Sequence, residues 1–193
     1  MTRTKLKEAA LRLFGEKGYD GTALSEIAKE VGVKTPAIYA FFAGKEDLFM
    51  AVFEESMSSY NEFIQALTDS SEGMSTENKL HALLLRQYDF HQNKQELAVF
   101  TFRYLVFPPD FLLDRMQEAF ERSDLLLGGI VRGIMLEGLE RGELAEVQVE
   151  TLVDAYLALM DGLGIQYYYY KSPELFERKQ QHAFDMFWRA VKA

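Results

Sequence analysis

Residues 22–42, TALSEIAKEVGVKTPAIYAFF, carry the pattern that decides the fold of this chain. They predict two short helices joined by a tight turn at Gly32, since glycine can take the left-handed conformation that ends a helix without steric cost. Ala28 is small enough for the two helices to cross closely, and Ile38 is placed to lock the second helix onto the first. This is the spacing of a helix-turn-helix, whose second helix lies in the major groove of DNA. The spacing alone leaves an ordinary helix hairpin in an all-helical core as the alternative.

A longer stretch around the motif favours the DNA-binding interpretation. Residues 11–52, LRLFGEKGYDGTALSEIAKEVGVKTPAIYAFFAGKEDLFMAV, resemble the DNA-binding domain of the TetR family of bacterial repressors. The features that carry the resemblance are, in chain order, Leu13, Phe14, the turn Gly18-Tyr19-Asp20-Gly21, the helix-turn-helix itself, Tyr39, Phe42, Lys45, Glu46 and Leu48. Further along the chain, residues 141–144, RGEL, and the helix after them look like the family's dimerisation segment.

The resemblance implies an all-α fold in two parts. Residues 1–45 are expected to form a three-helix, helix-turn-helix DNA-binding domain, and residues 46–193 a helical ligand-binding and dimerisation domain. The hydrophobic periodicity agrees, because it stays close to 3.6 residues almost throughout. The expected helices cover about 4–17, a segment from Thr22 to the Gly32 turn, 35–42, 45–67, 77–92, 95–107, 110–141, 149–170 and 172–191, with a loop at 68–76. Whether 110–141 is one helix or breaks near Ser123 is left open by the pattern.

The candidate DNA contacts combine side-chain chemistry with the resemblance. Thr22 is expected to cap the first motif helix, whose free backbone N–H groups suit a phosphate. Lys34 can bond a guanine or a phosphate, and the family contacts the DNA backbone from the positions of Tyr39 and Lys45. Phe41 departs from the family's pattern, which often has a polar residue there, so part of the specificity is expected to come from DNA shape. The full predicted set is Thr22, Lys34, Thr35, Pro36, Ala37, Tyr39, Ala40 and Lys45.

The net charge of −9 is unusual for a DNA-binding protein until its distribution is considered. Residues 1–50 carry eight lysines and arginines against seven aspartates and glutamates, so this segment has a formal charge of +1. The acidic excess therefore lies in the rest of the chain, which favours an N-terminal DNA contact. The alternative is that so weak an imbalance has no meaning, because +1 is not a basic patch.

Catalytic and metal-binding motifs are missing from the sequence. His81, His91 and His182 form no HExxH pattern and have no metal-binding partner at helical spacing. GxSxG, P-loop and GxGxxG signatures are also absent, so we expect no enzyme, no cofactor and no metal. The sequence has no cysteine, no signal-peptide pattern and no uninterrupted apolar run of about 20 residues. A cytoplasmic protein with no membrane partner is expected.

Aromatic and methionine side chains crowd the predicted C-terminal domain. The resemblance implies an inducer pocket there, and adaptable methionine and aromatic walls would suit a largely apolar ligand. For most of these residues, ordinary core packing is the alternative. The candidate ligand-binding residues are Tyr88, His91, Phe102, Arg103, Phe107, Met135, Met160 and Tyr167.

The segments around 125–136 and 149–170 are too apolar for the surface of a monomer. A helix that is apolar on nearly every side must be buried on every side. Their glycines would let helices approach closely, so we expect them to pair across a two-fold axis. The candidate interface residues are Leu126, Gly129, Ile130, Gly133, Tyr156, Met160 and Leu163.

Two functional hypotheses follow from these observations. In the first, the chain is a homodimeric transcriptional repressor that holds double-stranded DNA at a palindromic operator and is released by a small, largely apolar inducer. In the second, it is a helical sensor or carrier of a small molecule, with a DNA head that no longer functions. Binding to DNA that weakens with salt separates the two.

Overall fold

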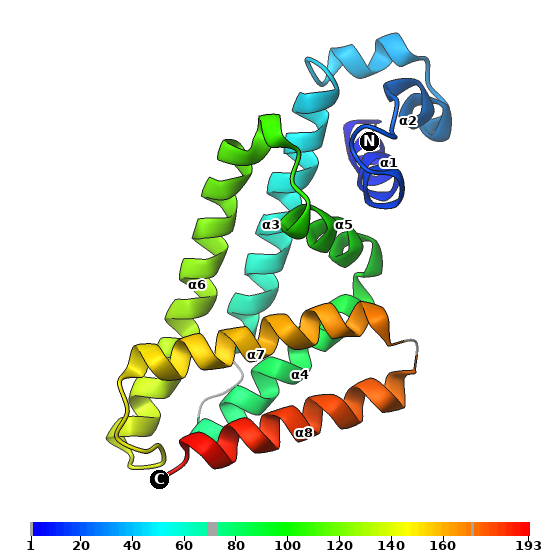
Figure 1. Ribbon diagram of the computed structural model, residues 1–193. Helices are drawn as coiled ribbons and strands as arrows, with labels where there is room; N and C mark the ends of the chain where they lie inside the picture. The colour runs from blue at the N-terminus through cyan, green and yellow to red at the C-terminus, as the bar shows by residue number, and fades with distance from the viewer. Residues whose placement is uncertain (1, 69–72, 171) are drawn as a thin grey trace. The chain divides into compact units, whose positions relative to one another are not determined.

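The computed structural model describes residues 2–68, 73–170 and 172–193, and every named element within these ranges is helical (Figure 1). The chain forms two compact units. Unit 1 consists of Met1–Phe63 and Phe90–Ser123, and unit 2 consists of Ile64–Asp89 and Asp124–Ala193. The functional division at residue 45 stays a prediction, because these units are defined by packing and not by role.

Unit 1 is built around a cluster of aromatic rings. Its elements are α1 (Thr2–Lys17), α2 (Leu24–Val31), the 3-10 helix η1 (Thr35–Ala40), most of α3 (Lys45–Thr68), α5 (Gln95–Val106), the 3-10 helix η2 (Asp110–Leu112) and the first part of α6 (Leu113–Glu140). The Phe49 ring is fully buried and lies 5.2 Å from Phe14 and 4.7 Å from Tyr104, measured between ring centroids. Helices α1, α3 and α5 therefore share one core, and the buried side chains of the helix-turn-helix belong to the same core.

Unit 2 contains most of α4 (Thr76–Asn93), the remainder of α6, α7 (Val149–Tyr169) and α8 (Pro173–Val191) (Figure 1). Tyr156 of α7 is fully buried, and its hydroxyl donates to the carbonyl of Leu80 on α4 at 2.5 Å. Gln180 of α8 is buried as well and donates to the Leu84 carbonyl at 3.1 Å. Trp188 packs half-buried against the same core.

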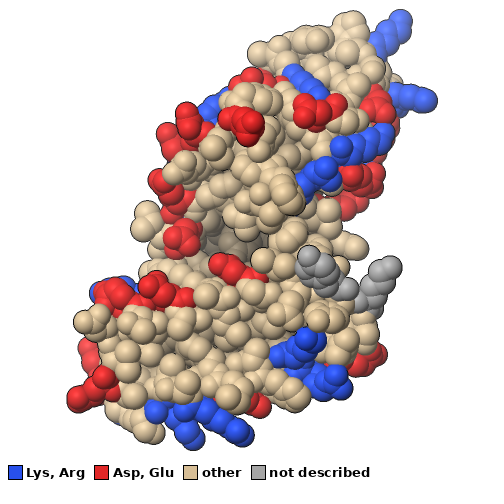
Figure 2. Space-filling model, in the orientation of Figure 1, with Lys and Arg blue, Asp and Glu red and all other residues tan. Residues whose placement is uncertain are grey.

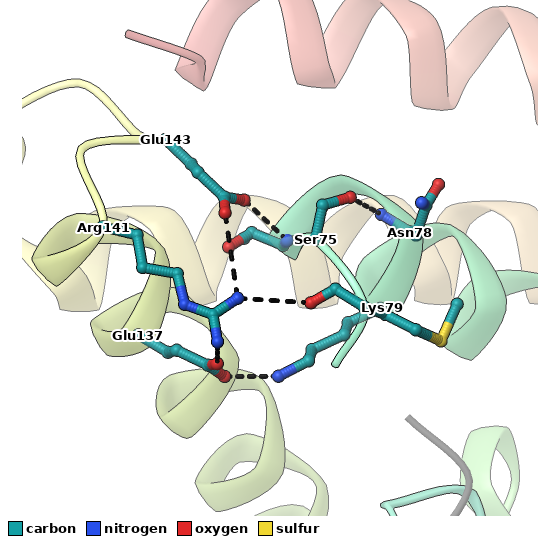
Figure 3. Close-up of polar contacts among 8 residues, drawn as sticks. Ser75, Asn78, Lys79, Glu137, Arg141 and Glu143 are labelled. Atoms are coloured by element: carbon teal, nitrogen blue, oxygen red, sulfur yellow. Dashed lines mark hydrogen bonds and ion pairs between the residues drawn. The ribbon is translucent and has the colours of Figure 1, made fainter. Parts of the chain in front are cut away.

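A polar cluster ties the start of α4 to the end of α6 (Figure 3). The Glu143 carboxylate accepts from the Thr76 backbone N–H at 2.7 Å, and this hydrogen bond is the first cause of the lowered pKa of Glu143. Lys79 and Arg141 both pair with Glu137. The RGEL segment therefore anchors the start of α4 within the chain, and its predicted part in dimerisation stays a prediction.

Most of the expected helices are confirmed to within a few residues. Helix α6 runs unbroken through Ser123, which answers the question left open by the sequence. The Ser172 hydroxyl caps α8 by accepting from the Leu175 N–H at 3.2 Å, and Gly142 ends the α6 region with a left-handed φ of +66°. Residues 69–72 of the expected loop lie outside the described residues. Within the described ranges, no helix combines the length and apolarity needed to cross a membrane.

Candidate nucleic-acid interface

The turn between α2 and η1 has the geometry that the sequence predicts. Gly32 adopts a left-handed φ of +75°, and its N–H donates to the Lys29 carbonyl at 3.1 Å. Val33 donates to the carbonyl of Ala28 at 2.9 Å, so the chain leaves α2 through a tight, fully bonded turn. Ile27, Ala28 and Ile38 are buried against α1, which fixes the two motif helices on one support.

Thr22 is not the helix cap that the sequence suggests. The capping residue is Ala23, whose backbone N–H donates to the Glu26 carboxylate at 3.0 Å. The Thr22 side chain is only 1% exposed, and its hydroxyl lies 2.8 Å from the Gly18 carbonyl and 3.0 Å from that of Leu13. The cap prediction is wrong because the buried hydroxyl is taken up by α1 and the following turn. The same burial turns this hydroxyl away from a phosphate.

The second motif helix is a 3-10 helix, η1, and not the α-helix expected at 35–42. Pro36 occupies its first turn, where a missing N–H costs no hydrogen bond. Ile38 faces the core, whereas Tyr39 is 59% exposed and Phe41 is 42% exposed. The structure thus brings six of the predicted contacts together on one short segment: Lys34, Thr35, Pro36, Ala37, Tyr39 and Ala40.

Lys45 is the first residue of α3, and its ammonium lies over the ring of Tyr19, 4.3 Å from the centroid. Arg3 of α1 is exposed, and its guanidinium carbon lies 5.3 Å from the ring centroid of Phe42. Arg3 is absent from the contacts predicted from the sequence, and Tyr19 appears there only as part of a turn. The basic residues near the N-terminus were the available signal for Arg3, but the Tyr19 contact depends on tertiary packing. Figure 2 shows lysine and arginine side chains projecting around the N-terminal helices, at its upper right, with acidic side chains beside them.

The eight candidate ligand-binding residues are divided equally between the two units. His91, Phe102, Arg103 and Phe107 belong to unit 1, and Tyr88, Met135, Met160 and Tyr167 belong to unit 2. Burial lowers the pKa of His91 to about 4, so its imidazole is neutral at neutral pH. A groove of about 470 Å³ in unit 1 lies between α1, α3 and the junction of α4 with α5, and none of the eight residues lines it. The ligand assignment therefore stays a prediction.

Two of the ligand candidates have identifiable packing roles. The Arg103 guanidinium donates to the carbonyl of Gly15 on α1 at 3.4 Å. The Met160 side chain is 1% exposed and belongs to the core of unit 2. Among the described residues, no group of three His, Cys, Asp or Glu side chains is arranged to hold a metal ion.

Three of the predicted interface residues face the wrong way for a dimer contact. Tyr156, Met160 and Leu163 are 0%, 1% and 5% exposed, respectively, within a single chain. Their apolar surface is already covered by the core of unit 2, so the prediction for these side chains is corrected. Gly129 and Gly133 of α6 lie on the outer surface, with no atom within 4 Å of where a Cβ would stand. Leu126 and Ile130 are half-buried.

Comparison with known proteins links this arrangement to a group of regulators. The family model for bacterial regulatory proteins of the tetR family matches residues 6–52. The fatty acid metabolism regulator protein of Bacillus subtilis is 27% identical over 141 residues, which is 72% of this chain and 69% of that protein. The transcriptional regulator AcrR of Shigella flexneri is 46% identical over 61 residues, or 32% of this chain and 28% of that protein.

The fold of almost the whole chain recurs in a solved structure. The transcriptional regulator FadR from Bacillus subtilis, in complex with stearoyl-CoA, matches with a TM-score of 0.74 and 22% sequence identity. The match covers 95% of this chain and 96% of that one. At this identity, the likeness establishes a shared helical architecture.

Proposed function

Because the chain belongs, through residues 6–52, to the tetR family of bacterial regulatory proteins, we propose that it represses transcription from a palindromic operator until an apolar inducer releases it. It is a DNA-binding transcriptional regulator. The observation that carries the proposal is the position of five predicted contacts on η1 and a sixth, Lys34, at its N-cap, directly after the hydrogen-bonded turn at Gly32. The alternative of a small-molecule carrier with a non-functional DNA head is not supported. The helix-turn-helix has its turn at Gly32, the buried residues Ile27, Ala28 and Ile38, and the exposed Tyr39.

The DNA contacts in this proposal divide into two kinds. Lys34 caps η1 and Thr35 is its first residue, and in this proposal both contact base edges, while Pro36, Ala37 and Ala40 present only apolar surface. In this proposal, Tyr39 and Lys45 contact phosphates, and such contacts fix the position of the helix but carry no sequence information. Thr22 acts indirectly, by fastening α1 to the turn before α2.

Replacing Lys45 with alanine is the direct test of a phosphate contact. The Lys45→Ala variant is expected to bind all DNA sequences more weakly and to reduce the slope of log affinity against log salt by about 1. Lys192→Ala, which removes an exposed lysine charge of unit 2, is the matched control. Fluorescence anisotropy across a salt series measures both variants. An unchanged slope for Lys45→Ala would contradict the phosphate assignment.

The proposed dimer uses the outer surface of α6 and α7. Gly129 and Gly133 on α6 and Gly162 on α7 have open space where a Cβ would stand, so a partner's helix could approach closely. The outward side of α7 continues this surface with the exposed residues Thr151, Ala155, Ala158 and Ile165, beside which Asp154 and Asp161 are also exposed. A two-fold pairing here would present two η1 helices to half-sites about 34–36 Å apart, or a multiple of that distance.

Coupling between inducer and DNA is supported by the packing of α5 on α1 within unit 1. The Tyr104 hydroxyl donates to the Phe14 carbonyl at 3.1 Å, and Arg103 donates to Gly15 in the next position. A Cβ on Gly15 would lie 3.6 Å from the Cβ of Phe100, so the two helices are in close contact. A ligand that displaces α5 would therefore move α1, and it must prefer the state that does not bind DNA.

The bound ligand of the Bacillus subtilis FadR structure suggests the first inducer to test. Stearoyl-CoA is expected to weaken operator binding by about 5- to 150-fold, the usual range of coupling between two sites. Coenzyme A without an acyl chain is the matched control and is expected to leave binding unchanged. Titration of each compound into a preformed protein–DNA complex measures the effect. Equal release by coenzyme A alone would contradict an apolar inducer.

A further inference from the structure

The ring of Tyr19 is held in place by three other aromatic side chains of unit 1. Phe14 stacks on it with ring centroids 5.8 Å apart and an interplanar angle of 13°. Phe49 and Phe111 meet it edge-on, at 5.3 Å and 5.1 Å, respectively. Burial is the main cause of the raised pKa of Tyr19, so the phenol stays neutral. The orientation of the Tyr19 ring is therefore fixed by its neighbours, and we call this ring, beside the start of α3, the platform.

The ammonium of Lys45 lies over this platform, 4.3 Å from the ring centroid, within the range of a cation–π interaction. The two acidic residues that follow Lys45 have partners elsewhere. Glu46 pairs with Arg115 at 3.0 Å, and Asp47 accepts from the Ala43 N–H at 2.8 Å. The ring of Tyr19 thus gives the half-buried lysine a defined position on α3.

A lysine side chain is flexible and loses rotamer freedom when it binds a phosphate. Restricting it beforehand improves affinity, because less ordering is then required during binding. We propose that Tyr19 is a positioning residue for DNA binding, whose ring face holds the Lys45 ammonium ready for a phosphate. The proposal rests on the phosphate contact of Lys45 proposed above. It adds a residue that touches no DNA and acts through the lysine alone.

Fluorination of the ring tests the proposal without changing its shape. Fluorine withdraws the negative charge from the ring face that attracts a cation. Tyr19→Phe is expected to bind DNA within about twofold of the native chain, because the face of the ring is kept. The protein with trifluorophenylalanine at position 19 is expected to bind DNA about two- to tenfold more weakly than Tyr19→Phe, because the released lysine must then be ordered during binding. Thermal unfolding of both proteins shows whether the fold is retained.

The same pair of residues at position 19 is then compared in the Lys45→Ala background. There, fluorination is expected to have no effect on DNA affinity, because the cation is gone. An equal effect of fluorination with and without Lys45 would overturn the positioning role, and so would the absence of any effect in the native background. A Lys45→Ala variant with unchanged affinity and salt slope would instead overturn the phosphate contact, and the positioning role with it. A merely structural role for Tyr19 would not produce a dependence on Lys45.

Discussion

Ala158→Arg on α7 is expected to leave the chain folded but monomeric, and to lower its affinity for a two-half-site operator by about a hundredfold or more. The native alanine is exposed, in the middle of the outward surface of α7. In the proposed dimer this position meets a partner's helix, and the bulk of an arginine side chain would keep the two helices from packing closely. Linking two DNA-binding heads in one dimer raises the affinity for a two-half-site operator by about 10²- to 10⁴-fold, because the first contact holds the second head at a high effective concentration near its half-site. A monomer loses that gain.

Two measurements separate this effect from misfolding. Sedimentation velocity should show a single chain for Ala158→Arg and a dimer for the native protein, with the same circular dichroism spectrum for both. Binding to a DNA with only one half-site should change much less than binding to the full operator. Gln117→Arg, on an exposed part of α6 in unit 1, adds the same charge and should remain dimeric. If Ala158→Arg stays dimeric, the proposed surface is wrong.

Phe49→Ala is expected to destabilise unit 1 by about 3–5 kcal/mol, the usual cost of removing a buried aromatic side chain. The Phe49 ring is fully buried and contacts five other rings from four segments of unit 1. Those rings are Phe14, Tyr19, Phe53, Phe100 and Tyr104. A loss of this size is a large share of the stability of a typical domain, about 5–15 kcal/mol. The Tyr19 ring, over which the Lys45 ammonium lies, would also lose its edge-on contact with Phe49.

Urea denaturation followed by circular dichroism measures the change through its transition midpoint. Leu113→Ala is a suitable control, because it removes an apolar side chain of unit 1 that is 44% exposed. Its midpoint is expected to stay close to that of the native chain. A Phe49→Ala midpoint as high as that of Leu113→Ala would mean that the aromatic cluster does not hold the unit together.

The sequence predicts helix ends well where a local signal determines them. Ser172 followed by Pro173 starts α8, and Gly32 ends α2, because caps and left-handed turns depend only on nearby residues. Thr22 shows the limit of this reasoning. It has the right chemistry for a cap, but its hydroxyl donates to carbonyl groups of α1 and of the turn after α1, and no local pattern reveals them.

The sequence also does not show which side of an apolar helix faces the core of its own chain. Tyr156 and Ala158 are two positions apart on α7, yet one is fully buried and the other exposed. The composition indicates correctly that α7 is very apolar, but Tyr156, Met160 and Leu163 fill the core of unit 2, whereas Ala155 and Ala158 lie outside. Lys45 is a third case, since its position over Tyr19 arises from the packing of α3 beside the turn after α1.

The placement of the one tryptophan has a spectroscopic consequence. Trp188 lies against the core of unit 2, whereas unit 1 is rich in phenylalanine and tyrosine, which emit at shorter wavelengths. Selective excitation of the indole therefore gives an intrinsic, label-free signal from unit 2 alone. If that emission changes when an operator is added, DNA binding by unit 1 alters the surroundings of Trp188 in unit 2. The change can be followed in real time and without any attached dye.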